Sequence, residues 1–198
     1  MIDEIIQKNF RTTKSFYTDK STIHSYDKIY DSIFKPYVDK EGSLLEIGVY
    51  GGGSLLLWQE YFNKMKIIGL DIQNIVPYTV FEMYNPDRVK YFLEDAYSDE
   101  TINFLKRNNL DKYDIIIDDG PHTEESQLRF VDLYLRMVHK NGLLVIEDVL
   151  SFDTVGKIVD RVHSILEPEH ESDYDITVYD KRGCAKKRYD DLLLVVSL

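Results

Sequence analysis

The sequence predicts an α/β fold: a mostly parallel seven-stranded sheet with helices on both faces and an antiparallel hairpin at the carboxyl-terminal edge. Three observations support this prediction. Compact apolar runs alternate with segments of helical spacing, which is the order of a parallel sheet with helical crossovers. These runs are too apolar to have a solvated face, as expected for strands covered on both sides. The last two runs have no helix-length segment between them, so they can pair as a hairpin.

The predicted elements follow in chain order. Residues 1–40 are polar and rich in tyrosine, and they predict short helices, the last of which is closed by Pro36. Apolar runs predict strands at residues 43–49, 66–71, 88–95, 113–118, 143–148, 175–180 and 191–198. Helical spacing predicts helices at residues 54–62, 99–107, 123–138 and 154–166. Asn141-Gly142 predicts the turn into the fifth strand. We therefore expect an N-terminal helical lid segment, residues 1–40, and a core, residues 41–198.

The charge balance restricts the possible partners. The chain has 35 acidic and 24 basic residues and a formal net charge of -11, which argues against nucleic acid or an anionic membrane as a partner. Cys184 is the only cysteine, so an intrachain disulfide is excluded, and the segment around it predicts a loop. No apolar run approaches the ~20 residues of a membrane span, and the first residues do not resemble a signal peptide. We expect a soluble, cytoplasmic protein, and the composition leaves its oligomeric state open.

The end of the first strand carries a glycine turn, "EIGVYGGGS", over residues 46–54. Glycines let a backbone approach a ligand closely. The spacing is not that of the dinucleotide fingerprint G-x-G-x-x-G. Glu46 at the strand end would repel a pyrophosphate and attract an ammonium or a sulfonium group. The charge therefore favours S-adenosylmethionine over NAD as the cofactor.

Acidic residues also end the second and third strands. Asp71 lies roughly 20 residues past the glycines, at the position where an acid binds ribose hydroxyls. Asp95 ends the third strand, where a carboxylate could accept a hydrogen bond from an adenine amino group. The alternative for either acid is a helix N-cap or a solvated turn.

Two pairs of acids end the fourth and fifth strands, namely Asp118-Asp119 and Glu147-Asp148. Neighbouring parallel strands would bring the four carboxylates to one edge of the sheet. Carboxylates this close repel one another, and this repulsion raises their pKa values unless a cation lies among them. Oxygen ligands of this kind suit Mg²⁺ or another divalent ion. The sequence therefore predicts a cation site at this edge.

His122 follows Asp119 by three residues, at the mouth of the predicted site. Methylation of an alcohol requires loss of its proton, and a metal lowers the pKa of a bound hydroxyl. A histidine that titrates near neutrality can accept this proton. The alternative for His122 is a helix-cap or surface histidine.

Three motifs together resemble a known family. "LLEIGVYGGGSLLLW", "IIIDDGPHTEESQ" and "LLVIEDV" are similar to motifs of the sugar O-methyltransferases of the mycinamicin and macrocin type. "TDKSTIHSYDKIYDSIF", residues 18–34, also resembles the segment that precedes their core. The resemblance implies a Rossmann-like class I methyltransferase fold, S-adenosylmethionine and Mg²⁺ as cofactors, and methyl transfer to a hydroxyl of a sugar such as rhamnose in a glycan or glycoside.

The resemblance also implies roles for single residues. The residues that it assigns to the cofactor are Glu46, Gly48, Tyr50, Gly51, Ser54, Asp71, Asp95 and Asp118. The metal ligands that it implies are Asp119, Glu147 and Asp148, with His122 as the general base. The residues that it places near the cofactor or acceptor pocket are Asp19, Lys20, His24 and Tyr26, whose alternative is local structure in a lid.

Three other functions stay open at this point. A catechol-type O-methyltransferase would use the same metal chemistry on a small aromatic diol. A module that binds NAD or a nucleotide sugar would share the glycine turn without methyl transfer. A domain that has lost catalysis would keep the cofactor pocket and serve as a platform for partners.

Overall fold

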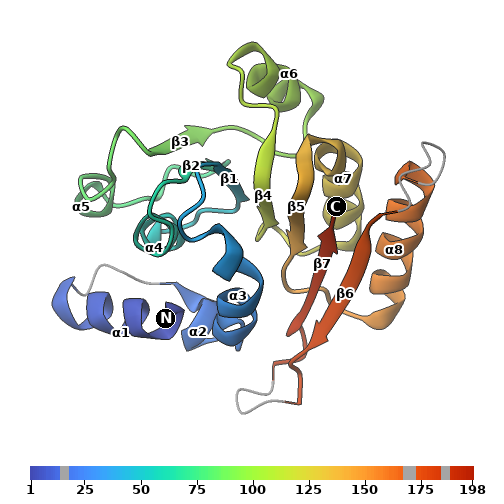
Figure 1. The fold of residues 1–198 in the computed structure, drawn as a ribbon, viewed down its shortest axis with the longest axis horizontal. Helices are drawn as coiled ribbons and strands as arrows, with labels where there is room; N and C mark the ends of the chain where they lie inside the picture. The colour runs from blue at the N-terminus through green and yellow to red at the C-terminus, as the bar shows by residue number, and fades with distance from the viewer. Residues whose placement is uncertain (14–17, 167–172, 184–187) are drawn as a thin grey trace.

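A computed structural model describes residues 1–13, 18–166, 173–183 and 188–198 (Figure 1). The predicted Cys184 loop lies outside the described residues. The strands are β1 (Ser43–Ile47), β2 (Lys66–Asp71), β3 (Val89–Leu93), β4 (Tyr113–Asp118), β5 (Val138–Ile146), β6 (Asp175–Asp180) and β7 (Leu192–Ser197). They form one sheet in the order β3-β2-β1-β4-β5-β7-β6. The pairs among β1 to β5 are parallel, and β7 is antiparallel to both β5 and β6. This confirms the predicted sheet and its carboxyl-terminal hairpin.

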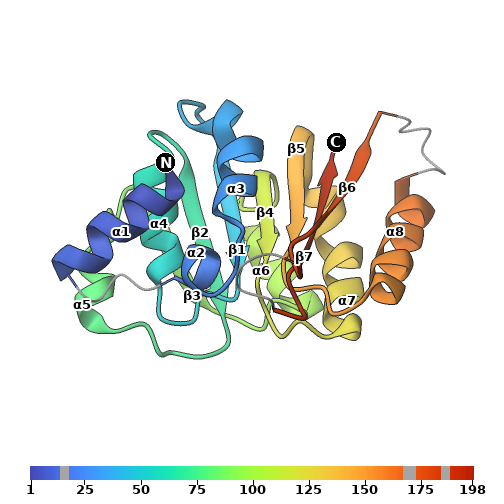
Figure 2. The ribbon, with the colours of Figure 1, turned by 90° about the horizontal axis from the view of Figure 1, so that it is seen from below.

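Helices cover both faces of the sheet, as predicted. They are α1 (Ile2–Thr13), α2 (Asp19–Thr22), α3 (Asp27–Phe34), α4 (Gly53–Tyr61), α5 (Tyr78–Phe81), α6 (Asp99–Arg107), α7 (Glu124–Tyr134) and α8 (Phe152–Leu166), with 3₁₀ turns η1 (Lys35–Tyr37) and η2 (Leu135–Met137). Residues of α1, α3 and α4 share one core cluster, and residues of α6, α7 and α8 share the other. Both views place α1 to α3 beside α4, and α7 beside α8 on the far side of the molecule (Figures 1 and 2).

The two cores result from the alternation of side chains along each strand. Leu44 and Ile115 point into the core of α1, α3 and α4, whereas Leu45 and Ile116 point into the core of α6, α7 and α8. All four side chains are fully buried. A run without polar residues is therefore explained by burial on both faces of the sheet.

The fifth strand and the helix before it differ from the prediction. The helix predicted over residues 123–138 ends at Tyr134, and β5 begins at Val138 instead of residue 143. The register with β4 shifts between Tyr113, which pairs with Val138, and Ile115, which pairs with Leu143. The residues between them form a bulge that contains Asn141 at φ 63°. The Asn-Gly pair therefore lies inside β5, at the register shift, and does not precede the strand.

The carboxyl ends of the central strands meet at one edge. Ile47 of β1 pairs with Asp118 of β4, and Asp118 pairs with Ile146 of β5. The residues that follow these positions are therefore neighbours in space. In the described part of the chain, the helices are all too short or too polar to cross a membrane.

Candidate active site

A cavity of about 540 Å³ lies beyond the carboxyl ends of β1 to β4. Ligands of open α/β sheets bind at this edge. The predicted site residues that line it are Asp19, Gly48, Tyr50, Gly51, Ser54, Asp71, Asp95, Asp119 and His122. The tertiary structure thus brings together two groups of predicted residues, those of the glycine turn and those at the mouth of the site.

The glycine turn comes close to the loop that follows β4. Gly48 has φ +85°, and a Cβ atom at this position would lie 1.9 Å from the backbone oxygen of Asp119. A side chain is therefore excluded both by the backbone conformation and by the lack of space. Gly48 lets the glycine turn and the loop after β4 lie against each other.

Asp71 holds the glycine turn in place. Its Oδ2 accepts hydrogen bonds from the backbone N–H groups of Val49, at 2.9 Å, and Tyr50, at 2.7 Å. Its Oδ1 accepts one from the N–H of Gln73 at 2.8 Å. In this structure Asp71 is an anchor of the turn that also faces the cavity, and contact with a ribose stays a prediction.

Glu46 is fully buried and is not among the residues that line the cavity. Its Oε2 accepts a hydrogen bond from the Ser54 hydroxyl at 2.6 Å. Its Oε1 lies 3.3 Å from Nζ of Lys20, so an ammonium group of the chain itself meets the carboxylate that was predicted to attract a positive group of the cofactor. The role of Glu46 toward a cofactor stays a prediction.

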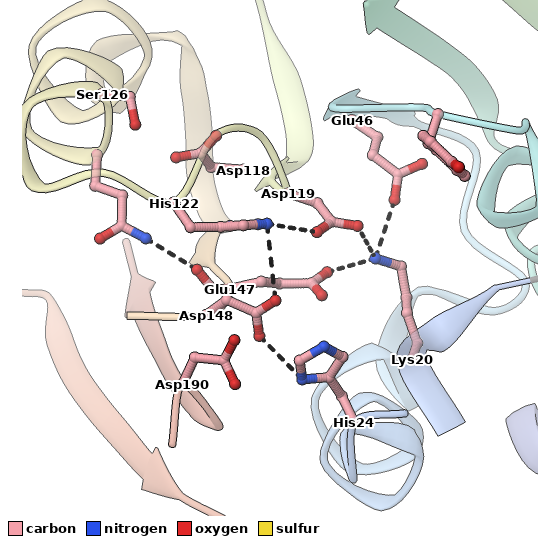
Figure 3. A network of polar contacts seen from close by, with 12 residues as sticks. Lys20, His24, Glu46, Asp118, Asp119, His122, Ser126, Glu147, Asp148 and Asp190 are labelled. Atoms are coloured by element: carbon pink, nitrogen blue, oxygen red, sulfur yellow. Dashed lines mark hydrogen bonds and ion pairs between the residues drawn. The ribbon is translucent and has the colours of Figure 1, made fainter. Parts of the chain in front are cut away.

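Lys20 occupies the centre of the acidic group (Figure 3). The Lys20 cluster consists of Lys20, Glu46, Asp119 and Glu147. Nζ of Lys20 lies 2.8 Å from Oδ2 of Asp119 and 2.6 Å from Oε1 of Glu147. The Lys20 side chain is fully buried, and its Nζ also lies 5.8 Å from the centroid of the Trp58 ring. The cation that the acids require is therefore partly provided by a residue of α2.

Burial and charge act against each other in the Lys20 cluster. Burial by itself lowers the pKa of Lys20, but the carboxylates of Asp119, Glu147 and Glu46 raise that pKa well above its ordinary value. Burial and the charge of Asp119 raise the pKa of Glu147 well above its ordinary value, although Lys20 opposes this shift. One ammonium group thus compensates the three carboxylates only in part.

His122 faces two carboxylates at the front of the site. Its Nε2 lies 3.8 Å from Oδ1 of Asp119 and 3.8 Å from Oδ2 of Asp148, and its side chain is 31% exposed. His122 and Asp148 have φ values of 58° and 53°, in the left-handed region that non-glycine residues rarely adopt. Such backbone strain clusters at functional sites, and here it turns both side chains toward one position.

The donor set of this front position fits a divalent ion. One ligand atom each from Asp119, His122 and Asp148 lie within 4.8 Å of one another. Carboxylate oxygens are ligands that Mg²⁺ and Mn²⁺ accept, with waters that complete the shell. The third predicted ligand, Glu147, instead groups with Glu46 and Asp119, where Lys20 lies. Among the described residues, the predicted set of Asp119, Glu147 and Asp148 is therefore divided between two positions.

Asp118 is separated from its neighbour Asp119. It is buried, and its Oδ1 accepts a hydrogen bond from the Tyr97 hydroxyl at 2.5 Å. Burial, reinforced by the charge of Asp119, raises the pKa of Asp118 to about 7 although the Tyr97 hydroxyl lowers it. Asp118 is not among the residues that line the cavity, whereas Tyr97, which donates to it, does line the cavity. Contact of Asp118 with a cofactor stays a prediction.

The raised pKa of Asp118 predicts a pH dependence of stability. The native state keeps this proton up to about pH 7, whereas the unfolded chain loses it near pH 4. The contribution of Asp118 to the free energy of unfolding therefore falls as pH rises between these values, by about 1.4 kcal/mol per unit. Urea unfolding of the metal-free protein across this range should show a shallower decline for Asp118→Asn. Equal pH profiles for the two proteins would contradict the assignment.

Several residues of the site were not singled out from the sequence. Tyr30 donates a hydrogen bond to Oε1 of Glu147 at 2.5 Å, and Nδ1 of His24 lies 2.5 Å from Oδ1 of Asp191. The sequence does contain an indication for Asp191. The pair Asp190-Asp191 stands directly before an apolar run, whereas the other two acid pairs stand directly after one. Tyr30 and Tyr97 had no comparable signal, since half-buried tyrosines are common in packing.

Comparison with known proteins identifies the family of the chain. The chain matches the model of the family described as a methyltransferase domain over residues 45–149, more than half of its length. It is 30% identical over 145 residues to demethylmacrocin O-methyltransferase of Streptomyces fradiae, covering 69% of this chain and 35% of that protein. It is 29% identical over 139 residues to 8-demethyl-8-alpha-L-rhamnosyl tetracenomycin-C 2'-O-methyltransferase of Streptomyces olivaceus, covering 67% and 35%. The chain thus spans about a third of the length of these relatives.

Solved structures share the fold. MycE methyltransferase from the mycinamycin biosynthetic pathway, in complex with Mg and SAH, superposes with a TM-score of 0.69 and 22% identity, over 94% of this chain and 52% of that chain. The O-methyltransferase from Bacillus cereus in complex with SAH superposes with a TM-score of 0.62 and 14% identity, over 100% of both chains. The predicted Rossmann-like class I fold is therefore confirmed, and by the match over residues 45–149 the chain belongs to the methyltransferase domain family.

Proposed function

We propose that this protein transfers a methyl group from S-adenosylmethionine to a hydroxyl of a sugar, such as rhamnose in a glycan or glycoside, with the help of a divalent metal ion. The observation that carries the proposal is that one cavity is lined both by the glycine turn and by Asp119 and His122. A methyl donor on one side would then lie next to a base and a metal ligand on the other.

The relatives support the choice of acceptor. The curated relatives are named for O-methylation of a rhamnosyl tetracenomycin and of demethylmacrocin. A third, mycinamicin VI 2''-O-methyltransferase of Micromonospora griseorubida, is 31% identical over 134 residues, which cover 64% of this chain and 32% of that protein. All three names describe O-methylation, and the first names a rhamnosyl compound, so we extend a sugar acceptor to this chain.

The residues of this chain would act in distinct roles. The turn at Gly48 to Ser54, held by Asp71, would bind the cofactor, whose sulfonium supplies an electrophilic methyl group. Oδ1 of Asp119 and Oδ2 of Asp148 would hold the divalent ion, which lowers the pKa of a bound hydroxyl. His122, whose Nε2 faces the same position, would accept the hydroxyl proton. A role for Glu147 as a further ligand requires its carboxylate to exchange Lys20 for the metal.

The N-terminal segment takes part in this site. We assign residues 1–40 as a lid on the core of residues 41–198. The ground is that α2 supplies Lys20 to the Lys20 cluster and that α3 supplies Tyr30, whose hydroxyl donates to Glu147 of that cluster. The acceptor would then be enclosed between this segment and the cavity mouth, which orients it toward the donor.

A transfer assay tests the proposed function. The full chain is incubated with S-adenosylmethionine and a panel of rhamnosides and catechols, and products are analysed by mass spectrometry. We expect a rhamnoside to gain one methyl group, with activity lost after EDTA treatment and restored by Mg²⁺. Methylation of catechols alone would favour the aromatic-diol enzyme, and full activity after rigorous chelation would refute the role of the metal. A thermal shift with NAD or UDP-sugars, but not with S-adenosylhomocysteine, would refute methyl transfer.

A further inference from the structure

We propose that Lys20 and Tyr26 are positioning residues for a divalent ion. Lys20 holds Oδ2 of Asp119 and Tyr26 holds Oδ1 of Asp148. The second oxygen of each carboxylate, called the front oxygen here in contrast to the held rear oxygen, then faces the ion. This inference rests on the metal dependence proposed above. It assigns a role to the N-terminal segment that goes beyond enclosing the acceptor.

The two carboxylates of the front position are held in the same manner. Asp119 binds Nζ of Lys20 through Oδ2, at 2.8 Å, and turns Oδ1 toward His122. Asp148 accepts a hydrogen bond from the Tyr26 hydroxyl through Oδ1, at 2.6 Å, and turns Oδ2 toward His122. Each carboxylate therefore has one oxygen bound by the N-terminal segment and the other at the front position, as Figure 3 shows for Asp119.

The donors are themselves fixed by packing. The Tyr26 side chain is fully buried, and its ring stacks on His24 at a centroid distance of 5.2 Å and meets the ring of Tyr30 edge-on at 6.3 Å. Nδ1 of His24 also lies 3.1 Å from Oδ1 of Asp148, the oxygen that Tyr26 binds. A rigid donor that meets the rear oxygen restricts rotation of the carboxylate.

Glu147 plays a supporting part in this arrangement. Its Oε1 receives both Nζ of Lys20, at 2.6 Å, and the hydroxyl of Tyr30, at 2.5 Å. Glu147 thereby anchors the ammonium group that holds Asp119. The acids are therefore divided into two groups. Lys20 binds among Glu46, Asp119 and Glu147, and a metal ion can bind at the front position, between Asp119, His122 and Asp148.

The physical basis is the known effect of side chains that hydrogen-bond to metal ligands without touching the metal. Such partners orient the ligands before the metal arrives, and their removal typically weakens metal binding about 10- to 100-fold. Tyr26 is the best residue for a test, because Phe keeps the ring packing and removes only the hydroxyl. Replacement of Lys20 would also remove a positive charge beside the metal, which has the opposite effect on affinity.

The experiment measures Mn²⁺ binding to the full chain by the loss of the free-ion signal in electron paramagnetic resonance. We expect Tyr26→Phe to raise the dissociation constant about 10- to 100-fold with unchanged secondary structure. His24→Phe, which removes the second group near the same oxygen, should weaken binding in the same direction. Tyr37→Phe is the matched control, because Tyr37 is a buried tyrosine of the same segment whose hydroxyl donates to the backbone oxygen of Asn141 at 2.7 Å. It should bind Mn²⁺ like the wild type.

A double-mutant cycle separates positioning from a general loss of structure. In the Asp148→Asn background, Tyr26→Phe should cause little further loss of Mn²⁺ affinity, because its carboxylate partner is gone. Wild-type affinity in both Tyr26→Phe and His24→Phe would overturn the inference, as would an equal loss in Tyr37→Phe or an additive loss in the double variant. If the wild-type chain binds no Mn²⁺, the proposed metal dependence fails, and this inference fails with it.

Discussion

Replacing His122 is expected to lower the turnover of methyl transfer about 10²- to 10⁴-fold, which is the usual contribution of a general base. The affinity for S-adenosylhomocysteine should remain, because the glycine turn and Asp71 are unchanged. His122→Asn is a sharper variant than His122→Ala, since asparagine tolerates the left-handed backbone at φ 58° and cannot act as a base near neutrality.

The measurement combines initial rates with calorimetric titration of S-adenosylhomocysteine. His139→Ala serves as the control, because His139 is an exposed histidine of β5 that lines a groove at the opposite edge of the sheet. Wild-type turnover in His122→Asn would remove His122 from the mechanism. Loss of cofactor binding together with turnover would instead assign His122 to the cavity wall.

Replacing Lys20 by methionine is expected to lower the free energy of unfolding by about 3–5 kcal/mol, the effect of removing one partner from a buried ion pair. The side chain of Lys20 is fully buried, and its loss leaves the carboxylates of Glu46 and Glu147 without the ammonium group that they contact. Methionine is similar to the apolar stem of lysine and lacks the ammonium group, so the change tests the charge more than the packing.

Lys40→Met is the matched control for this prediction. Nζ of Lys40 lies 2.7 Å from Oδ1 of Asp114, but its side chain is 42% exposed, so its loss should cost at most about 1 kcal/mol. Chemical unfolding in EDTA measures both variants. Added Mg²⁺ should stabilise Lys20→Met more than the wild type, because a second cation position becomes available. A loss in Lys20→Met no larger than that in Lys40→Met would contradict the role of Lys20.

Much of the fold could be predicted because strands buried on both faces leave a clear pattern. The strands at residues 66–71, 113–118 and 175–180 and the helix at 99–107 have the predicted bounds. The start of β5 could not be predicted, because a bulge and a turn share the same Asn-Gly signal. The pairing register with β4 decides between the two.

The candidate site also has features that the sequence predicted and features that only the structure shows. The sequence by itself determined that acids end β2 and β4 and follow β5, and that a glycine turn follows β1, since strand ends are local features and parallel strands share an edge. Only the tertiary structure decided which cation meets which oxygen. Lys20 contacts Glu147 across 127 positions of the chain, and Tyr26 contacts Asp148 across 122. Such contacts depend on how α2 and α3 pack over the sheet edge, and local sequence pattern carries no information about that packing.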